Sequence, residues 1–368
     1  MLRWETEINM VTSLNKPMRY LTGFLACTIC LGQAPQSTDD LPKRSDIIVQ
    51  LNVVIAPTTV LDRQGNYING LSLDDFKLYD NNKPQRITAD IGQEPLSLVV
   101  AVQASSMLTD VLPKIQHIGT MLDDLIIGQN GEVAVLAFDH RIRVVQDFTS
   151  DPGKIQVAMK NLTAGSSTSA LVDAETQAVR MLSKRLPDHR RVLLLISEKR
   201  DKGSEGKLRE ALTATQLANV TVYSIDISHF VAQITGHTPM PAPDPFPATA
   251  QHVPAGGVQT PTSVDTQLYA GNYIPMFVDI FKAGKSLFID DTLDVFTRYT
   301  GGKEYSFIKQ KDLEKAVTAL GEELHSQYLL SYTPTTQDEG GYHDIRVEVN
   351  RPRLEVRTRP GYWVAARP

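Results

Sequence analysis

Apolar and polar positions alternate along the first part of this chain. Over residues 46–92, segments rich in Val and Ile, such as DIIVQLNVVIAP, are interrupted by turn signals at 64–65, 69–70 and 81–82. Period-two patterns of β-branched residues bounded by Gly and Asn are typical of strands. This first segment therefore predicts β-structure.

The pattern changes in the next segment, residues 97–227. Short apolar runs lie at 98–102, 131–138, 190–197 and 220–227. Between these runs, apolar residues recur at helical spacing over 111–126 and 170–182. Buried strands that alternate with amphipathic helices are typical of a mostly parallel sheet covered by helices.

A segment rich in Pro, Ala, Gly and Thr interrupts this pattern at residues 229–285. Its proline-rich composition disfavours a regular helix or a central strand, so we expect an insertion that leaves the sheet at its carboxyl edge. Beyond it, helices are expected at 288–299 and 311–325, with a short strand at 303–307. Gly301 is expected to end the first of these helices, because glycine tolerates a left-handed backbone.

The chain returns to β-type patterns at its end, in the runs 328–334, 342–350 and 353–363. Neither end alone has enough strands for a stable pair of sheets, so we expect the two ends to form one sandwich together. The predicted fold class is α/β, a doubly wound and mostly parallel sheet inserted in a β-sandwich built from both chain ends. The predicted organisation is a signal at 1–34, an N-terminal β segment at 35–94, an α/β domain at 95–325 and a C-terminal β segment at 326–368.

The N-terminus has the layout of a secretory signal. Lys16 and Arg19 precede the apolar stretch LTGFLACTICLGQA, which ends in small residues at Ala34. A basic region followed by an apolar and a small-residue region predicts export and cleavage near Ala34, with Met18 as an alternative start. We therefore expect a secreted, periplasmic or outer-surface bacterial protein with no transmembrane span after cleavage.

Cysteine usage and charge exclude several classes of site. Both cysteines, Cys27 and Cys30, lie in the predicted signal, so the mature chain would have no disulfide, thiolate chemistry or cysteine-based zinc site. Cys27 in FLAC loosely resembles a lipid-attachment site, which is the less favoured interpretation of this region. A formal net charge of −5 over 368 residues, without a basic patch, argues against a nucleic-acid partner.

Motifs spread from residue 46 to 363 resemble those of a known family. They include GLSLDDFKLYDNNKPQRI, FDHRIRVVQDFTSD, LLLISEKRD, YTGGKEY and SQYLLSYTP, in that order. The α/β part resembles a von Willebrand factor A-type domain, and the mature chain resembles the VWFA-related domain proteins common in Acidobacteria. The resemblance implies a binding or adhesion domain with a metal-ion-dependent adhesion site. In that site an Asp-x-Ser-x-Ser loop, a Thr and an Asp hold Mg²⁺, a cation that prefers oxygen ligands.

The first loop of this chain departs from that motif. Gln103 stands where the first Asp is expected, and Ser105 matches the first Ser. Met107 occupies the second Ser position, so Ser106 could replace it only if the loop shifts.

The other two loops depart as well. Ser169 falls at the Thr position, or Thr168 after a slip of one residue, and Glu198 replaces the last Asp. The resemblance therefore assigns the metal-ligand positions to Ser105, Ser106, Ser169 and Glu198. The loss of a carboxylate favours a remnant of a magnesium site over a functional one.

The residues around Ser105 do not match those of a catalytic serine. A nucleophile elbow needs small residues on both sides of its serine, whereas Gln103 and Met107 flank Ser105. Thr168 and Asp226 are candidates for the ligand-binding face, since Asp226 ends a predicted strand at the carboxyl edge.

The function these features favour is a secreted, non-catalytic binding or adhesion-type protein. Its loop face would contact a protein or a surface glycan of unidentified nature. One alternative is a structural or assembly module of the cell envelope that associates, with itself or other chains, through exposed strand edges. A metal-dependent hydrolase is a further and disfavoured alternative.

Overall fold

The computed structural model describes residues 53–90, 92, 94–122, 131–235, 291–306, 310–335 and 340–364. The predicted signal with Met18 and Cys27, and residues 236–285 of the predicted insertion, lie outside these described residues. Among the described helices, none combines the length and apolar character that a membrane crossing requires.

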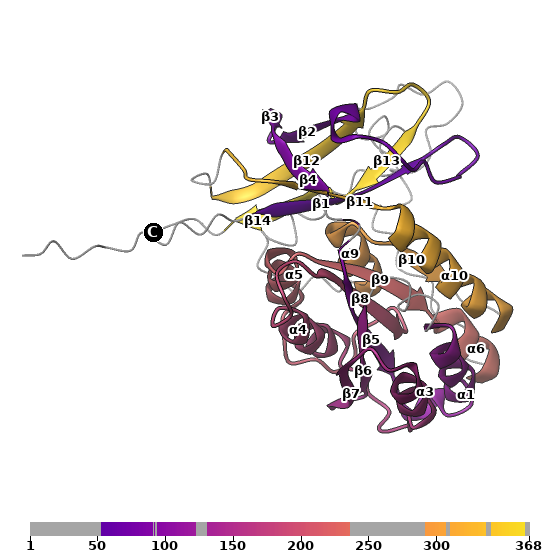
Figure 1. Cartoon of the computed structure of the whole chain (residues 1–368). Helices are drawn as coiled ribbons and strands as arrows, with labels where there is room; N and C mark the ends of the chain where they lie inside the picture. The colour runs from indigo at the N-terminus through magenta and orange to yellow at the C-terminus, as the bar shows by residue number, and fades with distance from the viewer. Residues whose placement is uncertain are drawn as a thin grey trace, which may run out of the picture. The chain divides into compact units, whose positions relative to one another are not determined.

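A six-stranded sheet forms the centre of the α/β part (Figure 1). In spatial order its strands are β10 (Glu304–Ser306), β9 (Val220–Asp226), β8 (Arg190–Ser197), β5 (Leu96–Gln103), β6 (Glu132–Phe138) and β7 (Ile142–Thr149). All neighbours pair in parallel except β6 and β7, which are antiparallel. All eight residues of β5 are buried, as expected of a central strand covered on both faces.

Helices cover both faces of this sheet. On one face lie α1 (Leu112–Gln116), α3 (Pro152–Lys160), α6 (Ser228–Thr235) and α10 (Gln310–Ser326), and on the other α4 (Leu171–Leu182), α5 (Leu208–Leu217) and α9 (Thr292–Thr300). Alternate residues of β5 point to opposite faces, so Leu98 and Val100 join one apolar cluster and Val99 and Ala101 join the other. The predicted doubly wound sheet is confirmed.

Two antiparallel four-stranded sheets make up the β part. The first sheet has the strand order β13 (Glu355–Thr358), β1 (Val54–Leu61), β11 (Tyr328–Tyr332) and β4 (Ile87–Asp90). The second sheet has the strand order β14 (Gly361–Val364), β12 (Gly341–Val349), β2 (Phe76–Asp80) and β3 (Lys83–Gln85). Each sheet combines strands from both ends of the chain, and both contribute to one apolar cluster. The predicted sandwich built from both chain ends is therefore confirmed.

Three expectations about single elements need correction. Up to residue 122, where the described part of this segment ends, the predicted 111–126 helix is broken into α1 and a 3₁₀ helix, η3 (His117–Thr120). Gly119 of η3 packs so closely on α3 that an added Cβ would lie 3.0 Å from Met159. The predicted strand 353–363 is two strands in different sheets, because Pro360 has no N–H for a continued ladder. The predicted insertion starts later than residue 229, since 228–235 form α6.

The end of α9 agrees with its prediction. Gly301 follows Thr300 with φ of +84° and caps the helix in the left-handed region. Gly302 then passes so close to β9 that an added Cβ would lie 1.9 Å from the carbonyl oxygen of Val222. The two glycines therefore bring the chain from α9 into β10 at the edge of the sheet.

Candidate functional site

The candidate site lies where the parallel strands of the central sheet end. Gln103, Phe138, Ser197 and Asp226 are the last residues of β5, β6, β8 and β9. Because parallel strands end at the same edge, the loops that follow them lie next to one another, at the edge where α/β folds bind ligands.

Backbone hydrogen bonds join the loops that follow β5 and β8 to the loop between α3 and α4. The N–H of Gly165 donates to the Ala104 carbonyl at 2.7 Å, and the N–H of Ser106 donates to the Ser166 carbonyl at 2.8 Å. The N–H of Lys202 donates to the Ser169 carbonyl at 3.0 Å. The loops 104–111, 164–170 and 198–207 are therefore held in one arrangement, which we call the loop platform.

The buried Gln103 side chain links the first loop to the third. Its Oε1 accepts hydrogen bonds from the Ser197 hydroxyl at 2.8 Å and from the Glu198 backbone N–H at 2.9 Å. Its Nε2 donates to Glu198 Oε2 at 2.8 Å and to Ser105 Oγ at 3.1 Å. A backbone N–H can only donate and a carboxylate can only accept, so this network determines the orientation of the amide.

Lys202 contacts the same carboxylate from the other side. Its Nζ lies 3.3 Å from both Oε1 and Oε2 of Glu198, while its backbone is bound to the Ser169 carbonyl. The Glu198 side chain is 14% exposed and that of Lys202 is 39% exposed. The carboxylate therefore has an amide donor on one side and an ammonium group on the other.

The remaining predicted residues are placed as follows. Ser105 is buried against Gln103, whereas Ser106 is exposed at the start of a short 3₁₀ helix, η2 (Ser106–Leu108). Ser169 is buried, and its Oγ has no hydrogen-bond partner. Thr168 is half-buried, with its Oγ1 3.5 Å from Ser166 Oγ. The structure thus joins Gln103, Ser105 and Glu198 through hydrogen bonds, while the Ser106 side chain faces solvent.

Other acidic side chains around the platform bind backbone N–H groups. Asp139 is buried and accepts from Ser166 N–H and Arg141 N–H, each at 2.7 Å. Burial opposes ionisation of Asp139, but these hydrogen bonds outweigh it and lower the pKa of the carboxyl group. Asp201 accepts from Leu171 N–H at 2.8 Å at the start of α4. These carboxylates stabilise the loops themselves.

Asp226 belongs to a separate acidic cluster around Lys199. Lys199 Nζ lies 2.5 Å from Asp291 Oδ2, 2.8 Å from Glu304 Oε1 and 4.0 Å from Asp226 Oδ2. Burial, and then the charge of Asp291, raise the pKa of Glu304 to about 7. Asp226 Oδ1 accepts from the Ser228 N–H at 2.8 Å and so helps to start α6.

The donor set does not match what a magnesium ion requires. Mg²⁺ binds oxygen atoms in an octahedron and depends on carboxylates to offset its dehydration. Here the amide of Gln103 directs its N–H groups at Glu198, and both oxygens of Glu198 already face cationic or N–H donors. Two hydroxyls remain, those of Ser105 and Ser169. Within the described part of the chain, no group of three or more His, Cys, Asp or Glu is arranged to hold a metal ion.

Sequence reasoning missed two residues of this arrangement, Lys202 and Ser197. A lysine four residues after Glu198 is an ordinary spacing for a surface ion pair, so the pattern had no distinctive signal. The sequence predicts Ser197 only as the end of a buried strand, and its hydroxyl meets Gln103 because β5 and β8 are neighbours in the sheet.

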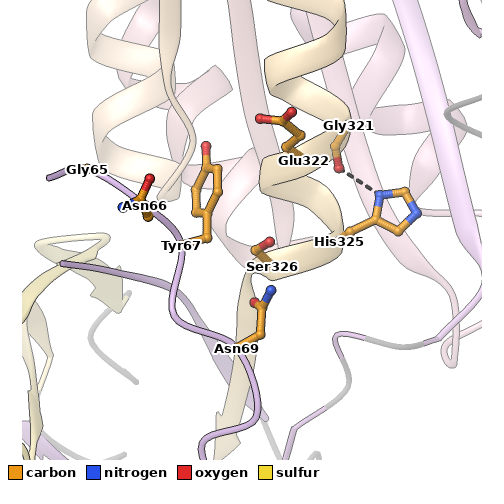
Figure 2. A pocket seen from close by; sticks show the side chains of 8 residues that line it. All are labelled: Gly65, Asn66, Tyr67, Asn69, Gly321, Glu322, His325 and Ser326. Carbon is orange, nitrogen blue, oxygen red and sulfur yellow. Dashed lines mark hydrogen bonds between the residues drawn. The ribbon is translucent and has the colours of Figure 1, made fainter.

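A groove lies elsewhere in the fold. Its volume is about 620 Å³. Figure 2 shows its lining residues, which come from the loop 65–69 and the last turns of α10. The end of α10 lies beside the start of β8, because Arg190 bonds the Leu324 carbonyl. The groove is therefore at the opposite edge of the sheet from the loop platform, and most of its lining side chains are exposed.

A family model and three solved structures resemble this chain. Residues 101–201 match the model of the von Willebrand factor type A domain, whereas no curated protein matches significantly. The vWF domain of the type V pili tip protein Mfa5 from Porphyromonas gingivalis is 15% identical, with a TM-score of 0.28, over 30% of this chain and 39% of that chain.

Two further structures match over longer segments. An aerotolerance-related membrane protein from Bacteroides fragilis is 13% identical, with a TM-score of 0.38, over 62% of this chain and 99% of that one. Proximal thread matrix protein 1 from the mussel byssus is 13% identical, with a TM-score of 0.41, over 74% of this chain and 50% of that one.

Proposed function

We propose that this chain, which carries a von Willebrand factor type A domain at residues 101–201, is an exported, non-catalytic binding protein that holds a protein or a surface glycan on its loop platform. The single observation that carries the proposal is the linkage of three loops by backbone hydrogen bonds. Loops already held in one arrangement lose little conformational entropy when a partner binds.

The side chains presented by the platform support this proposal. Ser106 is exposed, and Met107 beside it is 38% exposed. A flexible thioether among polar groups is a common feature of protein-binding surfaces. Ser105, by contrast, is fully buried, so it is not accessible as a nucleophile.

Photocrosslinking tests this assignment. A photoreactive amino acid at Met107 should capture a partner in the source cells, since this position lies on the proposed binding face. Leu217, which is 65% exposed at the end of α5 and outside the platform, provides a matched control position. Equal capture at both positions, or capture at 217 alone, would remove the support for this face.

Export is the second part of the proposal, and it rests on the N-terminal pattern that ends at Ala34. Mass spectrometry of the protein expressed in a bacterium with its signal should find a mature N-terminus near residue 35. An intact N-terminus on protein confined to the cytoplasm would contradict export. A diacylglyceryl group on Cys27 would instead indicate a lipid anchor.

A further inference from the structure

The third loop of the platform contains a cationic side chain that is absent from the expected metal-site motif. Lys202 lies at the edge of the buried network formed by Gln103, Ser105 and Glu198. Its position raises the question of what balances the charge of Glu198, a carboxylate that is largely withdrawn from water.

We propose that Lys202 Nζ takes the place of the divalent cation in this site, so that the loop platform is assembled without metal. This inference concerns the site of the proposed function, but it stands on the internal contacts of the chain and does not need the partner to be known.

The first argument is the orientation of the Gln103 amide. Its Oε1 accepts from Ser197 and from the Glu198 N–H, so only N–H groups are left to face the Glu198 carboxylate. A metal ion near Glu198 would therefore meet hydrogen-bond donors at the position of the expected first Asp. Turning the amide over would place two donors against each other at the Glu198 N–H.

The second argument is charge. Glu198 is the one negatively charged side chain that the described residues place at the predicted ligand positions, and one ammonium group balances it. A divalent cation would have to displace Lys202 and would gain a single carboxylate in return, which is too little to offset the dehydration of Mg²⁺.

The third argument is that Lys202 is held in place at both ends. Its backbone N–H is bound to the Ser169 carbonyl and its Nζ to Glu198. It therefore links the second and third loops, as a bound ion shared between loops would do. The two hydroxyls of Ser105 and Ser169 remain as neutral groups beside this pair.

Isothermal titration and thermal melts with Mn²⁺ and Mg²⁺ test the proposal. The wild-type chain should show no binding and the same melting temperature in EDTA and in 5 mM metal, about the concentration a weak site would need. The double variant Gln103→Glu/Lys202→Met removes the ammonium group and sets two carboxylates against each other. This variant should bind Mn²⁺ and melt about 5 °C higher at a hundredfold excess over its Kd.

Lys207→Met provides the matched control, because Lys207 is an exposed lysine of the same loop whose ammonium group pairs with Glu210 at the surface. Combined with Gln103→Glu, it should produce at most a much weaker metal response than Lys202→Met does. A metal-dependent shift of the wild-type chain that disappears in Glu198→Gln would overturn the proposal. A folded double variant without any metal response would also overturn it, because Gln103 and Lys202 would then not be what excludes the ion.

A double-mutant cycle of Glu198→Gln and Lys202→Met covers the case in which the carboxylate pair prevents folding. The proposal requires that the effects of the two substitutions on the free energy of unfolding are not additive, since the two side chains interact. It also requires that this coupling energy is the same in EDTA and in about 5 mM Mg²⁺. A coupling that vanishes in Mg²⁺, or that is absent in EDTA, would contradict the replacement of the metal by Lys202.

Discussion

Glu175 is a carboxylic acid side chain that the fold withdraws completely from water. It points from α4 toward α5, where its Oε1 accepts a hydrogen bond from the hydroxyl of Thr215. Burial raises the pKa of this carboxyl group to about 8, because the loss of water outweighs the hydrogen bonds from nearby threonine hydroxyls. The folded protein therefore favours the protonated, neutral form of Glu175 up to a higher pH than the unfolded chain does.

This burial predicts a dependence of stability on pH. Between pH 4.5, the ordinary pKa of the group, and about pH 8, the folded chain holds a proton that the unfolded chain has lost. Unfolding thus releases a proton, and the free energy of unfolding falls as the pH rises, by up to about 1.4 kcal/mol per pH unit.

Glu175→Gln should remove this contribution. We expect the variant to be more stable than the wild type at pH 8 and to differ little from it at pH 4.5, the lower end of the window. Urea unfolding at several pH values measures the effect. A variant that is less stable than the wild type at pH 8 would show that the carboxylate is ionised and paired.

At the scale of elements, Lys199 joins four parts of the fold that are distant in sequence. It follows β8 and contacts Asp291 at the start of α9, Glu304 in β10 and, at 4.0 Å, Asp226 at the end of β9. Neighbouring hydrogen bonds and charges outweigh burial and raise the pKa of Lys199, which keeps it cationic. A single ammonium group thus holds three carboxylates together at the edge of the sheet.

Lys199→Met should leave these carboxylates without a cation and destabilise the chain by about 2–3 kcal/mol at pH 8. The loss should be smaller at pH 5, because Glu304, with its pKa raised to about 7, is then protonated in both proteins. Chemical unfolding at the two pH values measures this difference. Lys207→Met, which breaks only an exposed pair, is the control and should cost less than about 1 kcal/mol.

At the scale of the whole molecule, the β-sandwich depends on both ends of the chain. β1 pairs with β11 and β13, β2 with β12, and β4 with β11, so three of the four N-terminal strands have C-terminal partners. Gln327, just before β11, also accepts from Arg190 at 2.8 Å and donates to the Gly301 carbonyl at 3.2 Å. Gln50–Pro368 accordingly form one compact unit.

A chain that ends at Ser326 should therefore lose the sandwich. Without β11 to β14, β1 has no ladder partner and β2 keeps only the short strand β3, so both strands expose their apolar face. Limited proteolysis with mass spectrometry should find rapid cleavage within 53–90, which the full-length chain resists. Protection of 53–90 in the truncated chain would mean that the N-terminal strands fold without the C-terminal ones.

The sequence by itself determined which segments are strands and helices, because burial imposes a period on hydrophobic residues that is visible without coordinates. The buried run of β8 and the spacing along α4 are examples, and the shortage of strands at each end predicted a shared sandwich. Motifs also indicated Gln103 and Glu198 as altered positions of one site. Local periodicity does not report strand order or close packing, so the break at Gly119 and the division of 353–363 between two sheets were missed.

Only the tertiary structure decided what the altered site contains. Gln103, Ser197 and Glu198 meet because β5 and β8 are adjacent, and Lys202 reaches Glu198 because its backbone is held by the second loop. Whether an amide presents its oxygen or its nitrogen depends on all the groups around it, which come from distant parts of the sequence. The same holds for the raised pKa of Glu175 and the triple contact of Lys199, since burial and charge balance are properties of the packed chain.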